Sequence, residues 1–90
     1  MYAPLRRPTP MPNLLIWNGY RFYFFSHEGN EPPHVHIDKD NRTAKLWLSP
    51  VSIAKNVRFR ENELAILERK VREERAFFLE KWNGYFERDR

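Results

Sequence analysis

The sequence contains no cysteine, and this absence excludes disulfide bonds and zinc sites built from thiolates. It also contains neither a signal-peptide pattern nor an apolar run long enough to cross a membrane. The lack of a signal peptide and of a membrane-length apolar run favours a cytoplasmic protein with no membrane partner.

The 90 residues nevertheless contain enough apolar material for a folded domain. Hydrophobic residues make up 41% of the chain and aromatic residues 16%, unlike the composition of a disordered protein, and large rings bury much area per residue. A chain of this length buries roughly 60 to 65% of the surface that it exposes when unfolded, which suffices for one core. We therefore expect a single domain.

Positive charge is concentrated in the first part of the chain. The net charge is +4; residues 1–59 contain 8 Lys and Arg against 4 Asp and Glu, whereas residues 60–90 contain 8 of each kind. All three histidines also lie in the first part. This distribution of charge would favour binding to a polyanion such as RNA, but so modest a net charge is also ordinary for a protein that needs it only for solubility.

Residues 1–12 contain four prolines and two arginines. This composition opposes regular structure and predicts an extended or disordered N-terminal arm. Met11 is a second candidate for the start of translation. The single domain is expected to comprise residues 13–90.

Two short apolar runs follow the arm and predict a β-hairpin. They cover residues 14–17 and 20–25 and are separated by Asn18-Gly19, a pair that a type I′ turn favours because both central residues need a positive φ. The second run is apolar on both faces, so its register stays open. The core face consists either of Tyr20, Phe22 and Phe24 or of Arg21, Tyr23 and Phe25.

The most informative segment is residues 31–38, with the sequence EPPHVHID. Its two prolines fix an extended backbone and lack an N–H donor, which suits a strand that begins at about His34. Alternation of side chains sends Val35 and Ile37 to the core and His34, His36 and Asp38 to the outer face. We expect both imidazoles to face outward on the same side of the sheet. Their Cα atoms would lie roughly 7 Å apart, close enough to act on one metal ion or one phosphate.

Residues 44–48 predict a fourth strand, which follows turn residues 39–42. In a regular hairpin, Lys45 and Trp47 share the outer face with the histidines. Residues 49–59 are weakly apolar and read as a connector with room for a helical turn or a fifth strand.

From Glu61 to Trp82 the apolar residues recur with the period of a helix, which predicts one long helix, straight or kinked, and Gly84 suits the position after its end. Arg75 falls within the apolar stripe, where a guanidinium needs a carboxylate partner or an exit to the rim. The predicted fold class is α+β: a four-stranded antiparallel meander with one long C-terminal helix packed on one face.

Several segments in this order resemble a family of small bacterial proteins, the domain-of-unknown-function family four-one-six-zero. The resemblance rests on residues 11–23, EPPHVH at 31–36, AKLWLSPV at 44–51, the predicted helix, and FLEKWNGYF at 78–86. It covers nearly all of the chain after residue 10. The resemblance implies a small α+β protein encoded beside another small protein and belonging to a toxin–antitoxin module; it implies no catalytic residues.

The first functional hypothesis is a toxin–antitoxin component that acts on RNA or on a partner protein through the face that carries His34 and His36. Two histidines that flank a phosphate would serve as general base and general acid. Arg21 and Lys45 would neutralise the phosphate, and Tyr23 or Trp47 would stack on a base. This reaction requires no metal or other cofactor.

The second hypothesis is a zinc or iron site in which His34 and His36 provide two ligands. A functional site needs a third protein ligand. Asp38, which shares their face, is one candidate, and His27 and Glu28 in the preceding loop are the others.

The third hypothesis is an interaction module without catalysis. Exposed aromatic residues such as Tyr23 and Trp47 are enriched at protein interfaces. The histidines would then simply hydrogen-bond the loop at residues 26–31 and hold it against the sheet. The expected partner is the small protein encoded by the adjacent gene.

Overall fold

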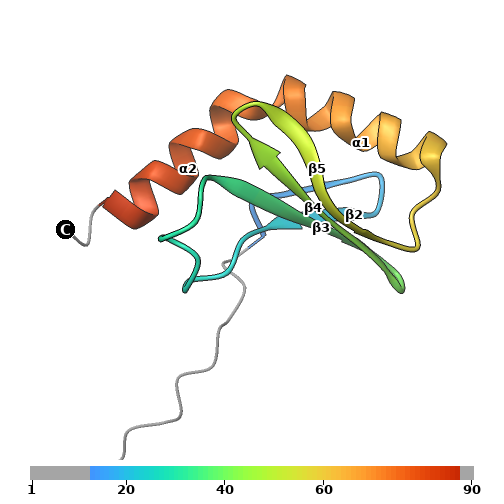
Figure 1. Ribbon diagram of the computed structural model, residues 1–90, viewed down its shortest axis with the longest axis horizontal. Helices are drawn as coiled ribbons and strands as arrows, with labels where there is room; N and C mark the ends of the chain where they lie inside the picture. The colour runs from blue at the N-terminus through green and yellow to red at the C-terminus, as the bar shows by residue number, and fades with distance from the viewer. Residues whose placement is uncertain (1–12, 88–90) are drawn as a thin grey trace, which may run out of the picture.

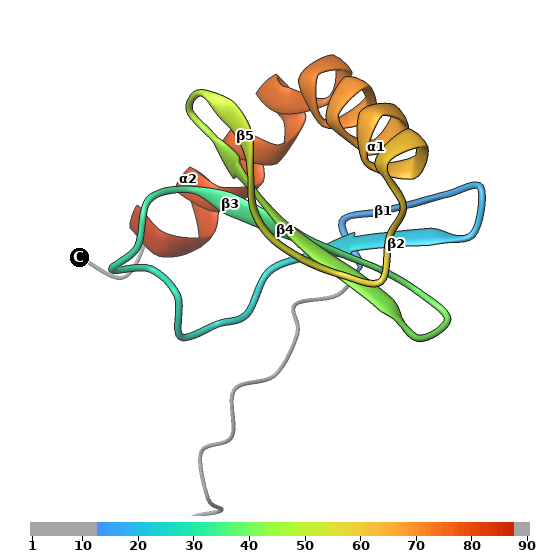
Figure 2. The same ribbon diagram turned by 45° about the vertical axis from the view of Figure 1, so that its right-hand side comes forward.

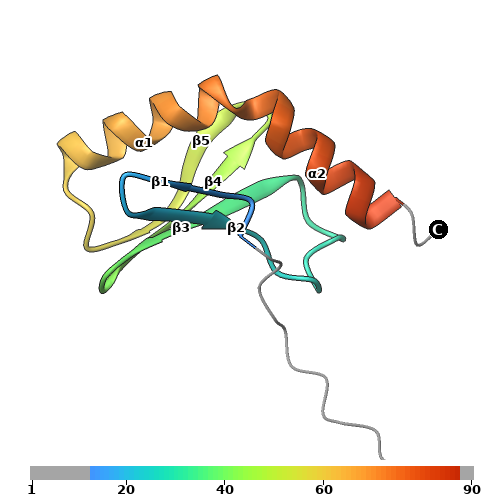
Figure 3. The same cartoon turned by 180° about the vertical axis from the view of Figure 1, so that it is seen from behind.

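The structure, a computed structural model, describes residues 13–87 as five β-strands followed by two α-helices (Figure 1). The strands form one antiparallel sheet in chain order, and both helices lie on the same side of it (Figures 1 and 3). The α+β class is thus confirmed, and the predicted arm at residues 1–12 lies outside the described residues. The elements are β1 (Leu15–Trp17), β2 (Tyr20–Tyr23), β3 (His34–Lys39), β4 (Arg42–Leu48), β5 (Val51–Val57), α1 (Glu61–Glu73) and α2 (Arg75–Glu87).

The hairpin of β1 and β2 turns where the sequence predicts it. Asn18 and Gly19 have φ angles of 51° and 82°, and both values are positive, as a type I′ turn requires. Of the two possible registers, the structure has Tyr20, Phe22 and Phe24 in the core.

β3 begins at His34, as the two prolines before it predict. The carbonyl oxygen of Pro33 accepts a hydrogen bond from the Leu48 N–H at 3.0 Å, which extends the pairing with β4 by one step. Val35 and Ile37 are completely buried beneath the helices. The inward half of the predicted alternation is therefore confirmed.

The prediction of four strands is wrong, because residues 51–57 form a fifth strand, β5. It pairs with β4 after a two-residue turn at Ser49-Pro50. Residues 53–56 of this edge strand are exposed, so their sequence lacks the apolar alternation that burial imposes. β5 is defined by its backbone hydrogen bonds to β4. The pattern of apolar and polar side chains does not predict such bonds.

The prediction of one long helix is also wrong, because the helical segment is divided at Glu74. α1 packs on β4 and β5, and α2 packs on β4 (Figure 2). The buried side chains Leu67, Val71 and Phe78 continue one apolar stripe across the division. α2 runs past Gly84 to Glu87, so Gly84 does not end it. Neither helix in residues 13–87 is long and apolar enough to cross a membrane.

Arg75, the first residue of α2, pairs with no carboxylate of the described residues, and its guanidinium reaches the partly exposed end of β4, in line with the predicted exit to the rim. Its Nε donates a hydrogen bond to the carbonyl oxygen of Leu48, and its Nη2 donates to Oγ of Ser49 at 2.9 Å. The guanidinium thus joins the start of α2 to the end of β4, which positions α2 over that end of the sheet.

Candidate functional site

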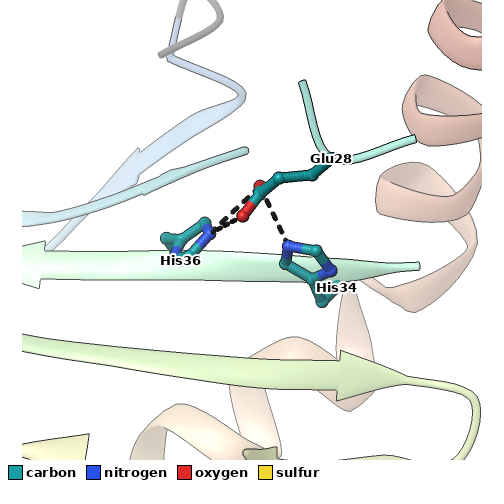
Figure 4. A group of neighbouring side chains, drawn as sticks. All are labelled: Glu28, His34 and His36. Carbon is teal, nitrogen blue, oxygen red and sulfur yellow. Dashed lines mark hydrogen bonds and ion pairs between the residues drawn. The ribbon is translucent and has the colours of Figure 1, made fainter. Parts of the chain in front are cut away.

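Three side chains converge where the β2–β3 loop (residues 24–33) folds over the start of β3. One ligand atom from each of Glu28, His34 and His36 lies within 4.8 Å of the others. Figure 4 shows both imidazoles on one side of β3, pointing toward the carboxylate that the loop brings down to them. The prediction that the two rings share a side of the sheet is confirmed.

Local hydrogen bonds in the loop fix the position of Glu28. Its Oε1 accepts the N–H of Phe25 at 2.9 Å, and its backbone carbonyl accepts the N–H of Glu31 at 3.0 Å. The residue is 5% exposed. A buried carboxylate is costly unless it is hydrogen-bonded and paired, so its position indicates that the site is built around it.

His36 is the closest partner of this carboxylate. Its Nε2 lies 3.1 Å from Oε1 and 2.9 Å from Oε2 of Glu28. Desolvation lowers the pKa of His36, and the contact with Glu28 opposes this only in part. Desolvation would raise the pKa of Glu28, but the hydrogen bonds from Phe25 and His36 outweigh it, and the pKa is lowered. Both shifts favour a neutral imidazole beside an ionised carboxylate.

His34 is arranged differently. Its Nδ1 lies 2.9 Å from the carbonyl oxygen of Pro32; a carbonyl only accepts, so Nδ1 carries the proton. Its Nε2 lies 2.9 Å from Oε1 of Glu28, yet the two atoms are not aligned for a hydrogen bond, and no other group in residues 13–87 bonds this buried nitrogen. In the neutral tautomer, two acceptors therefore face each other at close range.

The prediction that both imidazoles face solvent is wrong for His34, which has no exposed surface. The β2–β3 loop covers it, and Trp82 of α2 packs against it with ring centroids 4.9 Å apart. The His36 side chain is 15% exposed. The sequence of β3 could not show this cover, because it comes from a loop and a helix distant along the chain.

Asp38 lies on the same face but is engaged elsewhere. Its Oδ2 accepts hydrogen bonds from Arg21 at 3.2 Å and from the Tyr23 hydroxyl at 2.9 Å, and its Oδ1 accepts one from Thr43 at 2.6 Å. Desolvation, together with the bond to Asp38, raises the pKa of Tyr23 to about 12. Of the three candidates for a third metal ligand, Glu28 is therefore the one that lies beside the histidines. Asp38 is bonded elsewhere, and His27 is an exposed loop residue.

The other predicted binding residues lie on the helix-free face, but Tyr23 is buried there, so the prediction that it is exposed is wrong. Nζ of Lys45 lies 2.7 Å from Oε1 of Glu31 and 4.7 Å from the ring centroid of Trp47. The Arg21 guanidinium lies 4.5 Å from the Tyr23 ring centroid. Cross-strand pairing places Tyr23, His36, Lys45 and Lys55 in one row across four strands. The sequence does not single out Lys55, because the exposed edge strand that carries it shows no alternation of apolar and polar residues.

A family profile described as domain of unknown function (DUF4160) matches residues 19–83, a range that includes all three residues of the cluster. No curated protein and no solved structure matches the chain. The match covers well over half of the sequence, from the β1–β2 turn into α2. This chain therefore belongs to the DUF4160 family.

Proposed function

We propose that this protein binds a divalent transition-metal ion, zinc or iron(II), through Glu28, His34 and His36. The observation that carries the proposal is the buried Nε2 of His34, which lies 2.9 Å from a carboxylate oxygen without a hydrogen bond to it. Two acceptors held together in a buried place repel each other. A cation bound between them turns that repulsion into two attractive contacts.

The spacing of the donor atoms supports the proposal. Zinc lies about 2.0–2.2 Å from imidazole nitrogen and carboxylate oxygen, so two ligands at a right angle are about 3.0 Å apart and two at a tetrahedral angle about 3.4 Å. The shortest contact from Glu28 to each histidine is 2.9 Å. The two contacts of Glu28 are therefore close to the spacing of metal ligands, and the three donor atoms together lie within 4.8 Å of one another.

The surroundings of His34 also fit a metal ligand. Histidines that bind metals usually donate their other ring N–H to a carbonyl or carboxylate, which fixes the tautomer and orients the ring. Pro32 supplies that carbonyl here. Two neutral imidazoles and a carboxylate suit zinc or iron(II), and three protein ligands leave a position for water or substrate.

The burial of His34 argues against the metal-free cleavage of RNA by two histidines. An acid and a base must both come within hydrogen-bond reach of the reacting atoms, and a ring without exposed surface needs the loop to open first. A toxin–antitoxin component that contacts RNA or the adjacent gene's product remains our second candidate. The stacked Lys45 and Trp47 on the helix-free sheet face favour it, because a cation beside a ring suits either partner.

The test of the metal site uses the full chain purified without a histidine tag. We expect the wild type to take one zinc ion from a chromophoric chelator and to give a visible spectrum with cobalt(II). His34→Ala and His36→Ala should each abolish both signals. His27→Ala is the matched control, because it removes an exposed imidazole of the β2–β3 loop that lies outside the cluster, and it should bind as the wild type does.

Two results would refute the metal proposal: zinc bound at less than about a tenth of an equivalent by folded wild type, or equal binding by the wild type and both cluster variants. Circular dichroism of each variant shows whether it is folded, and His36, the more exposed of the two, is the less disruptive position. For the second candidate, cells expressing the wild type and the double variant would be compared for growth and RNA integrity. Equal results in both cultures would count against an RNA-directed role.

A further inference from the structure

A pocket of about 320 Å³ opens on the helix-free face of the sheet, beside the cluster. His36 forms part of its wall, whereas Glu28 and His34 do not line it. His36 is also the most exposed of the three cluster side chains. The pocket therefore adjoins the cluster through the ring of His36, and its volume lies at the lower end of the range for small-molecule sites.

The lining of the pocket has one apolar side and one cationic side. Tyr23 and Phe25 provide two rings in edge-to-face contact, with centroids 5.4 Å apart. Lys45 and Lys55 provide two ammonium groups from β4 and β5, and no carboxylate belongs to the part of the wall that the described residues form. The Tyr23 and Thr43 hydroxyls both donate to Asp38, so the lysines are the main donors available to a ligand.

The two lysines are directly opposite each other in the antiparallel pair of β4 and β5. Like charges in this arrangement destabilise a sheet. Lys45 is compensated by Glu31 at 2.7 Å, but Lys55 forms no ion pair with any residue between 13 and 87. An anion in the pocket would compensate the second charge and relieve the repulsion.

We infer that this pocket binds a small organic anion with a flat apolar body. Its carboxylate or phosphate group lies at Lys45 and Lys55, and its body lies against Tyr23 and Phe25. The inference rests on the proposed function in that it places this ligand beside the bound metal, with only His36 between them. It adds a substrate class to the metal site: an aromatic or similarly planar acid.

The test is a titration of the isotope-labelled full chain, followed by the amide signals of the pocket residues in NMR spectra. The probes are benzoate, phenyl phosphate, inorganic phosphate and benzamide, the last being the neutral counterpart of benzoate. We expect saturable shifts at His36 and Lys45 with benzoate or phenyl phosphate, and at least tenfold weaker binding of benzamide and inorganic phosphate. Comparing benzoate with phenyl phosphate identifies the charged group.

Lys55→Gln should weaken binding of the organic anion by about threefold or more, as loss of a partly exposed ion pair predicts. Lys45 is a poorer choice, since it also holds Glu31. Lys81→Gln is the matched control, because Lys81 is exposed on α2 and does not line the pocket. The inference is overturned if benzamide binds as well as benzoate, if inorganic phosphate binds as well as phenyl phosphate, or if Lys55→Gln binds as the wild type does.

Each titration is performed on metal-free and zinc-loaded protein, so the two proposals fail separately. Anion binding by a chain that takes up no zinc would support the pocket and refute the metal site. Zinc binding without any saturable shift at the pocket amides would refute the pocket and leave the metal site intact.

Discussion

Glu28 is the residue on which two interpretations of the cluster depend. As a structural residue, it accepts hydrogen bonds from Phe25 and His36 and holds the β2–β3 loop against β3. As a metal ligand, it shares an ion with both histidines. The two interpretations differ at His34, because a bound metal ion would use its Nε2, which has no hydrogen bond within the described residues.

Replacement of Glu28 by glutamine distinguishes them. The amide oxygen at the Oε1 position keeps the bond from the Phe25 N–H, and the NH₂ group at the Oε2 position lies beside Nε2 of His36, which can accept from it in the other tautomer of that ring. We therefore expect the free energy of unfolding of the metal-free protein to fall by less than about 1 kcal/mol. Zinc affinity should fall by more than the roughly 10- to 100-fold that loss of an outer-shell partner costs. Urea unfolding and chelator competition measure the two quantities.

The control for this substitution is Glu31→Gln, which alters a carboxylate in the same loop. Its Oε1 lies 2.7 Å from Nζ of Lys45 and 3.9 Å from Nδ1 of His34, on the side of that ring away from Glu28. Glu31→Gln should leave zinc affinity within about twofold of the wild type, as a partly exposed ion pair contributes little. If Glu28→Gln instead lowers stability by about 1–3 kcal/mol while the wild type takes up no zinc, the carboxylate is only structural.

At the scale of elements, the β2–β3 loop and α2 position each other. Gly29, next to Glu28, packs so closely on α2 that an added Cβ would clash with Cδ1 of Phe86. Phe86 in turn packs on Trp82, with ring centroids 4.4 Å apart, and Trp82 covers His34. The absence of a side chain at position 29 is therefore what allows the loop to close over the histidines.

Gly29→Ala should disturb both the loop and the site. Relief of the clash requires the loop or the Phe86 ring to move, which we expect to cost about 1–3 kcal/mol of stability. Because Glu28 is the adjacent residue, zinc affinity should fall as well. Urea unfolding gives the first effect and chelator competition the second.

Two further variants test this explanation. In Gly29→Ala combined with Phe86→Ala the clash is absent, so the double variant should lose less stability than the sum of the two single losses. Gly84→Ala is the matched glycine control in α2; nothing lies within 4 Å of its added Cβ, and it should stabilise the protein by about 0.5–1 kcal/mol. Strict additivity in the double variant would show that Phe86 is not what excludes a side chain at position 29.

At the scale of the whole molecule, one polar network joins the helix layer to the sheet. Glu63 of α1 accepts hydrogen bonds from the Tyr20 hydroxyl at 2.9 Å and from Arg42 at 2.6 Å. Desolvation would raise the pKa of Glu63, but the bonds from Tyr20 and Arg42 outweigh it, and the pKa lies below the ordinary 4.5. The ionised form of Glu63 is thus more stable in the folded protein than in the unfolded protein.

The sign of the resulting pH dependence follows from linkage. Because the folded-state pKa of Glu63 is the lower one, its contribution to stability is present above pH 4.5 and is lost as the pH falls through the folded-state pKa. Glu63→Gln should therefore be less stable than the wild type at pH 7, and the difference should shrink below pH 4.5. Urea unfolding at a series of pH values between 7 and 3 measures it.

Glu61→Gln is the control for this series, since Glu61 lies in the same first turn of α1 but is exposed and makes no ion pair with the described residues. Its stability relative to the wild type should vary less with pH. A difference between Glu63→Gln and the wild type that stays constant from pH 7 to 3 would contradict the role given to the network.

The sequence by itself determined the parts of this protein that depend on neighbouring residues. The Asn18-Gly19 turn, the start of β3 after two prolines and the shared side of the two imidazoles all follow from backbone sterics and a two-residue period. Only the tertiary structure decided which residues cover those imidazoles. Long-range packing of the β2–β3 loop and α2 buries His34 and brings Glu28 to it. Asp38, which shares the face of the histidines, instead accepts hydrogen bonds from Arg21 and Tyr23. The existence of β5 was also decided only by the tertiary structure. An exposed edge strand is defined by its pairing with the neighbouring strand, and its side chains show no pattern of burial.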